Sequence, residues 1–346
     1  MDSGKELRGY EGHEDAIIAV AFSIDGRRAY SAGKDGTVRV WKLPDGYGDR
    51  IAPFSDVAAG VALSEQSAQG QEVLAKCGGD ETVQLFTMPD RKPPVTLAGH
   101  QHMVVCVALT RDGLTAASGS WDKTVKLWNV ADGTTRHTLT GHGGVVRAVV
   151  FSADGSILAS AGADQTIKLW DAATGRPRGT LKGHTGAVWS LAFSDDGKTL
   201  VSAGVDRTVR VWDVEERKQL RTLTGHKGPV WAVAITRDGK YIASGGDDQT
   251  VRMWYTDTGR DWRVLPGHQA AVRAVAFTKD GIGLASGGLD GTVRTWDVAS
   301  GRAGNQMEKT DDAKYTSLVF QDDCKLLIAG TSDGGVKMWT LSPRDP

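Results

Sequence analysis

Tryptophan recurs along this 346-residue chain at a nearly constant spacing, and this period constrains the fold more than any other feature of the sequence. Successive members of the series are about 42 residues apart, and one position holds phenylalanine instead. The positions are Trp41, Phe86, Trp128, Trp170, Trp212, Trp254, Trp296 and Trp339. A fixed period of this length is the signature of a repeat protein. Eight units account for essentially the whole chain, so we expect a single domain over residues 1–346.

Each unit predicts four short strands. In the unit that contains Trp170, segments 145–151, 157–160 and 166–170 are rich in β-forming residues, and segment 178–181 leads into the next unit. Asp154-Gly155 predicts a tight turn between the first two strands, and Asp-Gly recurs at the same place in other units. A four-stranded sheet of this size cannot bury its faces alone, so the units must stack on one another. Twisted sheets stacked face to face around an axis form a β-propeller, which gives an all-β fold of antiparallel blades.

One unit carries the spaced elements Gly141-His142, Asp154-Gly155, Ser160 to Thr166 and Trp170-Asp171. With these elements recurring in six units, residues 6–340 resemble the WD40-repeat family, the β-transducin-like propellers. The resemblance implies that the recurrent His, Ser, Asp and Trp of a unit form a buried hydrogen-bond network. Two such networks are His142, Ser160, Asp164 and Trp170, and His184, Ser202, Asp206 and Trp212.

A histidine, a serine and an aspartate could instead form a hydrolase triad. An active site needs one copy, however, and this set recurs in register in six units. We therefore interpret the sets as scaffolding and expect no enzyme activity. No His-x3-His or paired-Cys spacing indicates a metal site, and no phosphate-binding loop is expected where no helix is predicted. The sequence therefore predicts neither a metal nor a cofactor.

Two units depart from the repeat. The second, about residues 50–91, lacks Gly-His and has Lys76 where other units have serine; the eighth, about residues 302–340, lacks Gly-His and has Ala329 there. Both have full length, which favours eight blades, with seven as the alternative. Residues 6–10 occupy a fourth-strand position that no earlier blade can receive. We expect them to pair with residues 335–339 and to close the ring.

Four tryptophans lie outside the series, namely Trp121, Trp189, Trp231 and Trp262. Five residues beyond the Gly-His histidine, units four to seven have Arg147, Trp189, Trp231 and Arg273, and the position before the turn aspartate has Trp121 in unit three and Asp247 in unit six. The family resemblance places both positions on the top face of a propeller, near its channel. Trp and Arg are enriched in binding hot spots. These six residues therefore predict a partner-binding site, unless the rings only pack on neighbouring loops. Trp262 is expected to cover an outer sheet edge.

Charge and hydropathy limit the possible partners. With 41 Lys+Arg against 42 Asp+Glu, the net charge is -1, so we do not expect a nucleic-acid partner. The longest apolar runs, residues 16–22 and 103–109, are too short to cross a membrane. The first residues do not resemble a secretory signal, and three scattered cysteines suit a reducing compartment, so we expect a cytoplasmic location.

The sequence as a whole favours a monomeric, non-catalytic scaffold or adaptor that binds a peptide or a partner's loop on its top face. Two alternatives stay open, a structural spacer in a larger assembly and an enzyme with its active site at the channel mouth.

Overall fold

The repeated unit folds into a small antiparallel sheet, as the unit that contains Trp170 shows. Its strands are β14 (Val146–Phe151), β15 (Ile157–Gly162), β16 (Thr166–Asp171) and β17 (Pro177–Lys182), hydrogen-bonded in that order. In the first turn, the Asp154 carboxylate accepts hydrogen bonds from the Ser156 amide and the Ser152 hydroxyl. Gly155 has a φ of 71°, which glycine adopts without steric cost. The four strands expected from the sequence agree with these bounds to within two residues.

The computed structural model describes residues 6–10, 12–23, 28–35, 37–42, 48–52, 58–64, 72–88, 94–306, 314–320, 326–332 and 336–340. These residues form eight four-stranded antiparallel sheets, which we number as blades 1 to 8 in chain order. The innermost strands are β2 (Ile17–Phe22), β6 (Ala58–Leu63), β10 (Val104–Leu109), β14, β18 (Val188–Phe193), β22 (Val230–Ile235), β26 (Val272–Phe277) and β30 (Tyr315–Phe320). The second strands are β3 (Arg28–Gly33), β7 (Glu72–Gly78), β11 (Thr115–Ser120), β15, β19 (Thr199–Gly204), β23 (Tyr241–Gly246), β27 (Gly283–Gly288) and β31 (Leu326–Thr331). The third strands are β4 (Val38–Lys42), β8 (Val83–Met88), β12 (Val125–Asn129), β16, β20 (Val209–Asp213), β24 (Val251–Tyr255), β28 (Val293–Asp297) and β32 (Val336–Thr340). The outermost strands are β5 (Gly48–Ala52), β9 (Val95–Leu97), β13 (Thr135–Leu139), β17, β21 (Lys218–Leu223), β25 (Asp261–Leu265), β29 (Ala303–Gln306) and β1 (Glu6–Tyr10).

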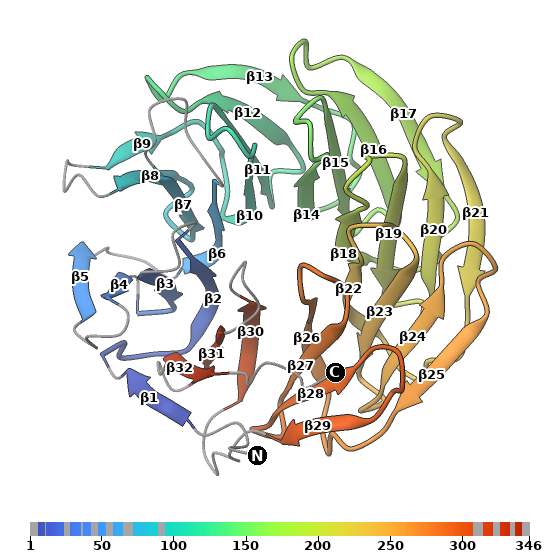
Figure 1. The fold of residues 1–346 in the computed structure, drawn as a ribbon. Helices are drawn as coiled ribbons and strands as arrows, with labels where there is room; N and C mark the ends of the chain where they lie inside the picture. Colours follow the sequence, from blue (N-terminus) through green and yellow to red (C-terminus); the bar gives the residue numbers. More distant parts are fainter. Residues whose placement is uncertain are drawn as a thin grey trace.

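The blades form a closed ring around a central axis (Figure 1). Each innermost strand contacts the innermost strands of both neighbouring blades, and β2 of blade 1 contacts β30 of blade 8. The eight-bladed β-propeller expected from the sequence is therefore confirmed, and the seven-bladed alternative is wrong. Both units that depart from the repeat form complete blades, because their strand segments are intact although their Gly-His pairs are missing.

The hydrophobic core lies between blades rather than within them. Between blades 4 and 5, for example, Ile167 and Leu169 of β16 pack with Val188 of β18, Leu200 of β19 and Trp212 of β20. All five side chains are almost completely buried. Equivalent clusters lie between the other described neighbours. Each repeated tryptophan therefore stabilises a contact between two blades, which explains why its period follows the blades.

The N-terminal strand completes blade 8. β1 pairs antiparallel with β32, with Arg8 opposite Met338 and Tyr10 opposite Val336. The expected pairing of residues 6–10 with the last third-strand segment is thus confirmed over residues 336–339; Gly335 lies outside the described residues. Blade 8 therefore contains strands from both ends of the described chain.

Candidate partner-binding site

The alternation of strand directions gives the ring two distinct faces. We call the end that carries the Gly-His loops and the turns between second and third strands the top face. The turns between first and second strands, and those between third and fourth strands, then lie at the other end, which we call the bottom face.

The recurrent polar side chains form the same hydrogen-bond chain in blades 4 and 5. In blade 4, Trp170 Nε1 donates to Ser160 Oγ at 2.8 Å, and the Ser160 hydroxyl in turn bonds to His142 Nε2 at 2.8 Å. His142 Nδ1 then donates to the Asp164 carboxylate at 2.8 Å, because the hydroxyl proton already occupies the Nε2 side. In blade 5 the corresponding chain comprises Trp212, Ser202, His184 and Asp206.

Burial and hydrogen bonding determine the protonation of this network. Burial lowers the pKa of His142 despite the opposing effect of Asp164, so the imidazole is neutral near pH 7. Burial raises the pKa of Asp164, but hydrogen bonds from the Gly143 amide and from His142 outweigh it, and the net pKa is lowered. Ser160 and Ser202 are 0% exposed, and each accepts a tryptophan N–H. A hydroxyl in this position cannot reach a substrate, which argues against catalysis at these sets.

The six residues singled out for partner binding lie on the top face, and the structure brings them into contact. We call Trp121, Arg147, Trp189, Trp231, Asp247 and Arg273 the arc. Four of them share one structural position, because the register of each innermost strand shifts there: Arg147 in β14, Trp189 in β18, Trp231 in β22 and Arg273 in β26. A β-bulge inserts an unpaired residue and redirects its side chain. The bulges therefore place these four side chains on the top face, one from each of four consecutive blades. The innermost strands of these blades lie side by side around the axis (Figure 1).

Guanidinium groups and indole rings contact one another along the arc. The Arg147 guanidinium lies 6.0 Å from the ring centre of Trp121 and 4.6 Å from that of Trp189. The rings of Trp189 and Trp231 meet edge to face at 5.1 Å, and the Arg273 guanidinium lies 4.2 Å from the ring centre of Trp231. These distances are typical of cation–π and aromatic pairs. The five side chains thus form one continuous chain of contacts across blades 3 to 7.

The Asp247 carboxylate lies near Trp231 and Arg273, at one end of this chain of contacts. Trp231 Nε1 donates to Asp247 Oδ1 at 3.1 Å. Burial lowers the pKa of Arg273, and the nearby Asp247 carboxylate opposes this effect. The arc as a whole therefore combines exposed aromatic area, with Trp121 49% exposed, and two cations against one carboxylate.

Two further residues bear on the extent of the site, one outside it and one beside it. Trp262 lies on β25 away from the arc, where its ring stacks on Tyr241 at 4.5 Å and packs against Tyr255 at 5.0 Å. Sequence reasoning missed Val205, which is 38% exposed at the turn position that Trp121 and Asp247 occupy in their own blades. The sequence signal that could have identified Val205 is an apolar residue directly before the turn aspartate, where an exposed position is expected.

Two other features are absent from the part of the chain that the structure describes. No group of three or more His, Cys, Asp or Glu side chains is arranged to hold a metal ion among the described residues. The same residues contain no helix with the length and apolar character needed to cross a membrane.

Comparison with known proteins points to one family. The family model described as "WD domain, G-beta repeat" matches residues 4–42, 91–129 and 133–171, and that of the "IFT122 first beta-propeller" matches residues 187–345. A crystal structure of the computationally designed Ika8 protein superimposes with a TM-score of 0.85 at 30% identity, covering 98% of this chain and all of that one.

Curated relatives match over shorter stretches. WD repeat-containing protein 37 of Xenopus tropicalis is 29% identical over 108 residues, which is 30% of this chain and 21% of the relative. Guanine nucleotide-binding protein subunit beta-like protein 1 of Mus musculus is 26% identical over 30% of this chain and 32% of the relative. Nuclear distribution protein PAC1-2 of Uncinocarpus reesii is 34% identical over 31% of this chain and 25% of the relative. The matches thus span between about a fifth and a third of these relatives.

Proposed function

Because the chain belongs to the WD40-repeat family of β-propellers, we propose that it is a non-catalytic interaction scaffold that binds a peptide or a partner's loop at the arc. WD40 propellers typically serve as protein-interaction scaffolds and are generally not enzymes. A fold alone hosts many functions, so the assignment of a site to this chain rests on the arc.

The observation that carries the proposal is the mutual packing of side chains that the repeat does not require. The scaffold positions around the arc are nearly identical from blade to blade, whereas the bulge residue changes from Ile18 and Val105 to arginine and tryptophan. Each guanidinium of the arc rests on a ring, and Trp189 also contacts Trp231. Side chains that support one another in this way are ordered before a partner arrives, which lowers the entropy cost of binding.

The chemistry of the arc suggests the kind of segment it accepts. Indole rings offer flat apolar contact area, and among the described residues Arg147 forms no ion pair. A partner segment that places an apolar side chain on the rings of Trp189 and Trp231 and a carboxylate on Arg147 would match both features. We therefore propose an acidic segment with an apolar residue as the ligand of the top face.

An enzyme at this face would need a proton-transfer group that the repeat does not supply. Asp247 is the carboxylate of the arc, and the indole N–H of Trp231 already bonds to it. His137, one of two histidines outside the repeat, lies on the outer strand β13 and contacts the carbonyl of Ala173. These contacts favour binding over catalysis.

The decisive experiment compares partner capture by the parent protein and by Trp189→Ala/Trp231→Ala. Removing two hot-spot tryptophans is expected to cost about 2 kcal/mol or more in binding, or roughly thirtyfold in affinity. In affinity capture from source extract with quantitative mass spectrometry, the main partner should be lost while the melting temperature stays within a few degrees. Val264→Ala, which trims an exposed side chain on the outer strand β25, is the control and should retain the partner.

Retention of the partner by the double variant would overturn the proposal and leave the spacer alternative. The same preparations test the accompanying expectations: light scattering after gel filtration measures whether the protein is the proposed monomer, and cell fractionation tests the proposed cytoplasmic location.

A further inference from the structure

A pocket of about 390 Å³ lies between blades 4 and 5, away from the arc. Its floor is apolar and includes Leu169 of β16 and Val214, both almost completely buried. Its rim includes Arg178 of β17, Lys198 in the turn between β18 and β19, and Glu215 and Arg217 in the turn between β20 and β21. These turns belong to the bottom face. The size falls within the range of about 300–1,000 Å³ that is typical of ligand sites.

The backbone at Arg217 is unusual among the corresponding turns. In blades 3, 4, 6 and 7 the equivalent residue is glycine, and all four glycines have a positive φ: Gly133, Gly175, Gly259 and Gly301. Blade 5 has arginine there, with a φ of 53°. This left-handed conformation is unfavourable for a residue with a Cβ atom. Arg217 thus places a long cationic side chain beside the pocket, where the corresponding turns of four other blades have glycine.

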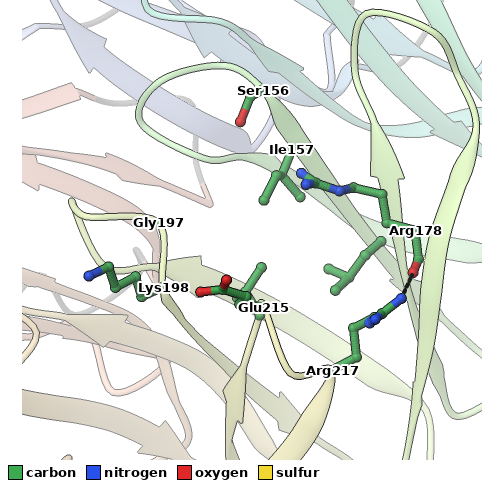
Figure 2. Close-up of a pocket in the computed structure, with 9 residues that line it drawn as sticks. Ser156, Ile157, Arg178, Gly197, Lys198, Glu215 and Arg217 are labelled. Atoms are coloured by element: carbon green, nitrogen blue, oxygen red, sulfur yellow. Dashed lines mark hydrogen bonds between the residues drawn. The ribbon is translucent and has the colours of Figure 1, made fainter.

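The Arg217 side chain spans the two blades. Its Nη1 atom donates to the backbone carbonyl of Arg178 at 3.0 Å, which ties the turn of blade 5 to the outer strand of blade 4. Figure 2 shows this bond at the edge of the pocket and the Arg178 guanidinium pointing inward near Ile157. Arg217 therefore fixes the strand from which Arg178 extends.

The charge of the rim favours an anion. Arg178, Lys198 and Arg217 face a single acidic residue of the lining, Glu215. Among the described residues, neither the Arg178 nor the Lys198 side chain forms a close ion pair, although Asp171 lies near Arg178 and Asp196 lies near Lys198. A guanidinium that points over an apolar floor can receive a carboxylate while an adjoining aliphatic side chain covers the floor.

We infer that this pocket is a second docking site and that its ligand is a short acidic peptide. An aliphatic side chain of the peptide lies on Leu169 and Val214, and an Asp or Glu carboxylate within a few residues of it pairs with Arg178. The inference does not depend on the arc, because the two sites share no residue and lie on opposite faces.

The test is a selection of random octapeptides displayed on phage, carried out on the intact protein. Peptides are selected on the parent and counter-selected on Arg178→Glu, an exposed substitution that reverses the rim charge. The selected sequences should place Leu, Ile or Val within three residues of Asp or Glu. A synthetic peptide of that sequence should bind the parent and lose at least tenfold in affinity for Arg178→Glu, measured by fluorescence anisotropy.

Two matched variants show whether peptide binding depends on the pocket itself rather than on overall positive charge or on misfolding. Arg217→Gly restores the residue used in the other blades, so it should fold normally and still weaken the peptide severalfold. Arg260→Ala removes a positive charge from the corresponding turn of blade 6 and should leave binding unchanged. A selection that yields no peptide sensitive to Arg178→Glu would overturn the inference. The inference would also be overturned if the protein bound phosphatidylserine vesicles but no peptide, and if Arg178→Glu abolished the vesicle binding.

Discussion

A buried serine hydroxyl connects the histidine and the tryptophan in each of six blades. Besides the two chains described above, the serines are Ser31, Ser118, Ser244 and Ser286. In these chains a loop residue, a second-strand residue and a third-strand residue are held within one hydrogen-bond network. A network of this kind is costly to break, because each remaining member loses a partner in a buried environment.

His184→Ala should therefore destabilise the protein. The substitution leaves the Ser202 hydroxyl and the Asp206 carboxylate without their shared partner, at a cost of about 1–3 kcal/mol in the free energy of unfolding. Urea denaturation measures the loss. His102→Ala, at an exposed loop position, is the control and should stay within about 0.5 kcal/mol. An equal loss in both variants would contradict the network argument.

The same residues predict how stability depends on pH. Burial lowers the pKa values of His100, His142 and His226, so the unfolded chain takes up protons first as the pH falls below about 6.5. Stability contributed by the neutral imidazoles is present above that pH and is lost below it. The melting temperature should thus fall between pH 7.5 and 5.5, and His142→Gln should reduce the slope.

A second loss of stability is expected at lower pH. The pKa of Asp122 is lowered to about 2 although burial opposes this, because hydrogen bonds from Thr124 and His100 favour the carboxylate. A carboxylate with a lowered pKa stabilises the fold above its unfolded value of about 4, and this stability disappears as the pH falls toward 2. A melting temperature that stays constant from pH 4 to 2.5 would contradict this assignment.

Unlike His184→Ala, the substitution Arg217→Gly should not destabilise the protein. Its left-handed φ is relieved by glycine, and the gain is offset by the greater freedom of glycine in the unfolded chain. We expect the free energy of unfolding to stay the same or rise by up to about 1 kcal/mol, as measured by urea denaturation. A clear destabilisation would show that the contact between Arg217 and the Arg178 carbonyl outweighs the strain.

At the scale of the strand, the sequence supports some conclusions and not others. Periodicity and Asp-Gly turns place β14 to β17 within two residues, because local propensity and turn chemistry agree there. Counting from Gly-His also finds the positions of Trp189 and Trp231. The bulges that expose these rings are not visible in the sequence, since a register shift depends on the pairing of two strands. The left-handed φ of Arg217 does not follow from its own turn residues, but glycine at the same position in four other units indicates it.

The closing strand β1 gives a prediction at this scale. Deleting residues 1–11 would leave the edge of β32 unpaired, and unpaired sheet edges promote aggregation. The melting temperature should fall, and light scattering should detect oligomers. An unchanged melting curve would show that the pairing of β1 with β32 adds nothing to ring stability.

At the scale of the whole molecule, the two candidate sites lie on opposite faces of the ring. The arc extends over blades 3 to 7 on one face, and the pocket between blades 4 and 5 opens on the other. A rigid scaffold of buried inter-blade contacts connects them. Energies at separated sites without shared partners usually add.

The two sites should therefore bind independently. Trp189→Ala/Trp231→Ala is expected to leave the affinity for a pocket peptide within about twofold of the parent, because distant sites couple weakly. Isothermal titration with and without the top-face partner measures any coupling. A change of tenfold or more would indicate that binding at one face alters the other.

The pairing of β1 with β32 also affects the time course of folding. Neighbouring blades can assemble soon after synthesis because their contacts are local, but blade 8 needs strands separated by more than three hundred residues. Contacts so distant in the chain form slowly. Until they form, blades 1 and 8 each keep an apolar side uncovered. The chain is thus most vulnerable to chaperone binding and proteolysis just before β1 pairs with β32. In the finished ring, the amide hydrogens of these two strands should be the first to exchange.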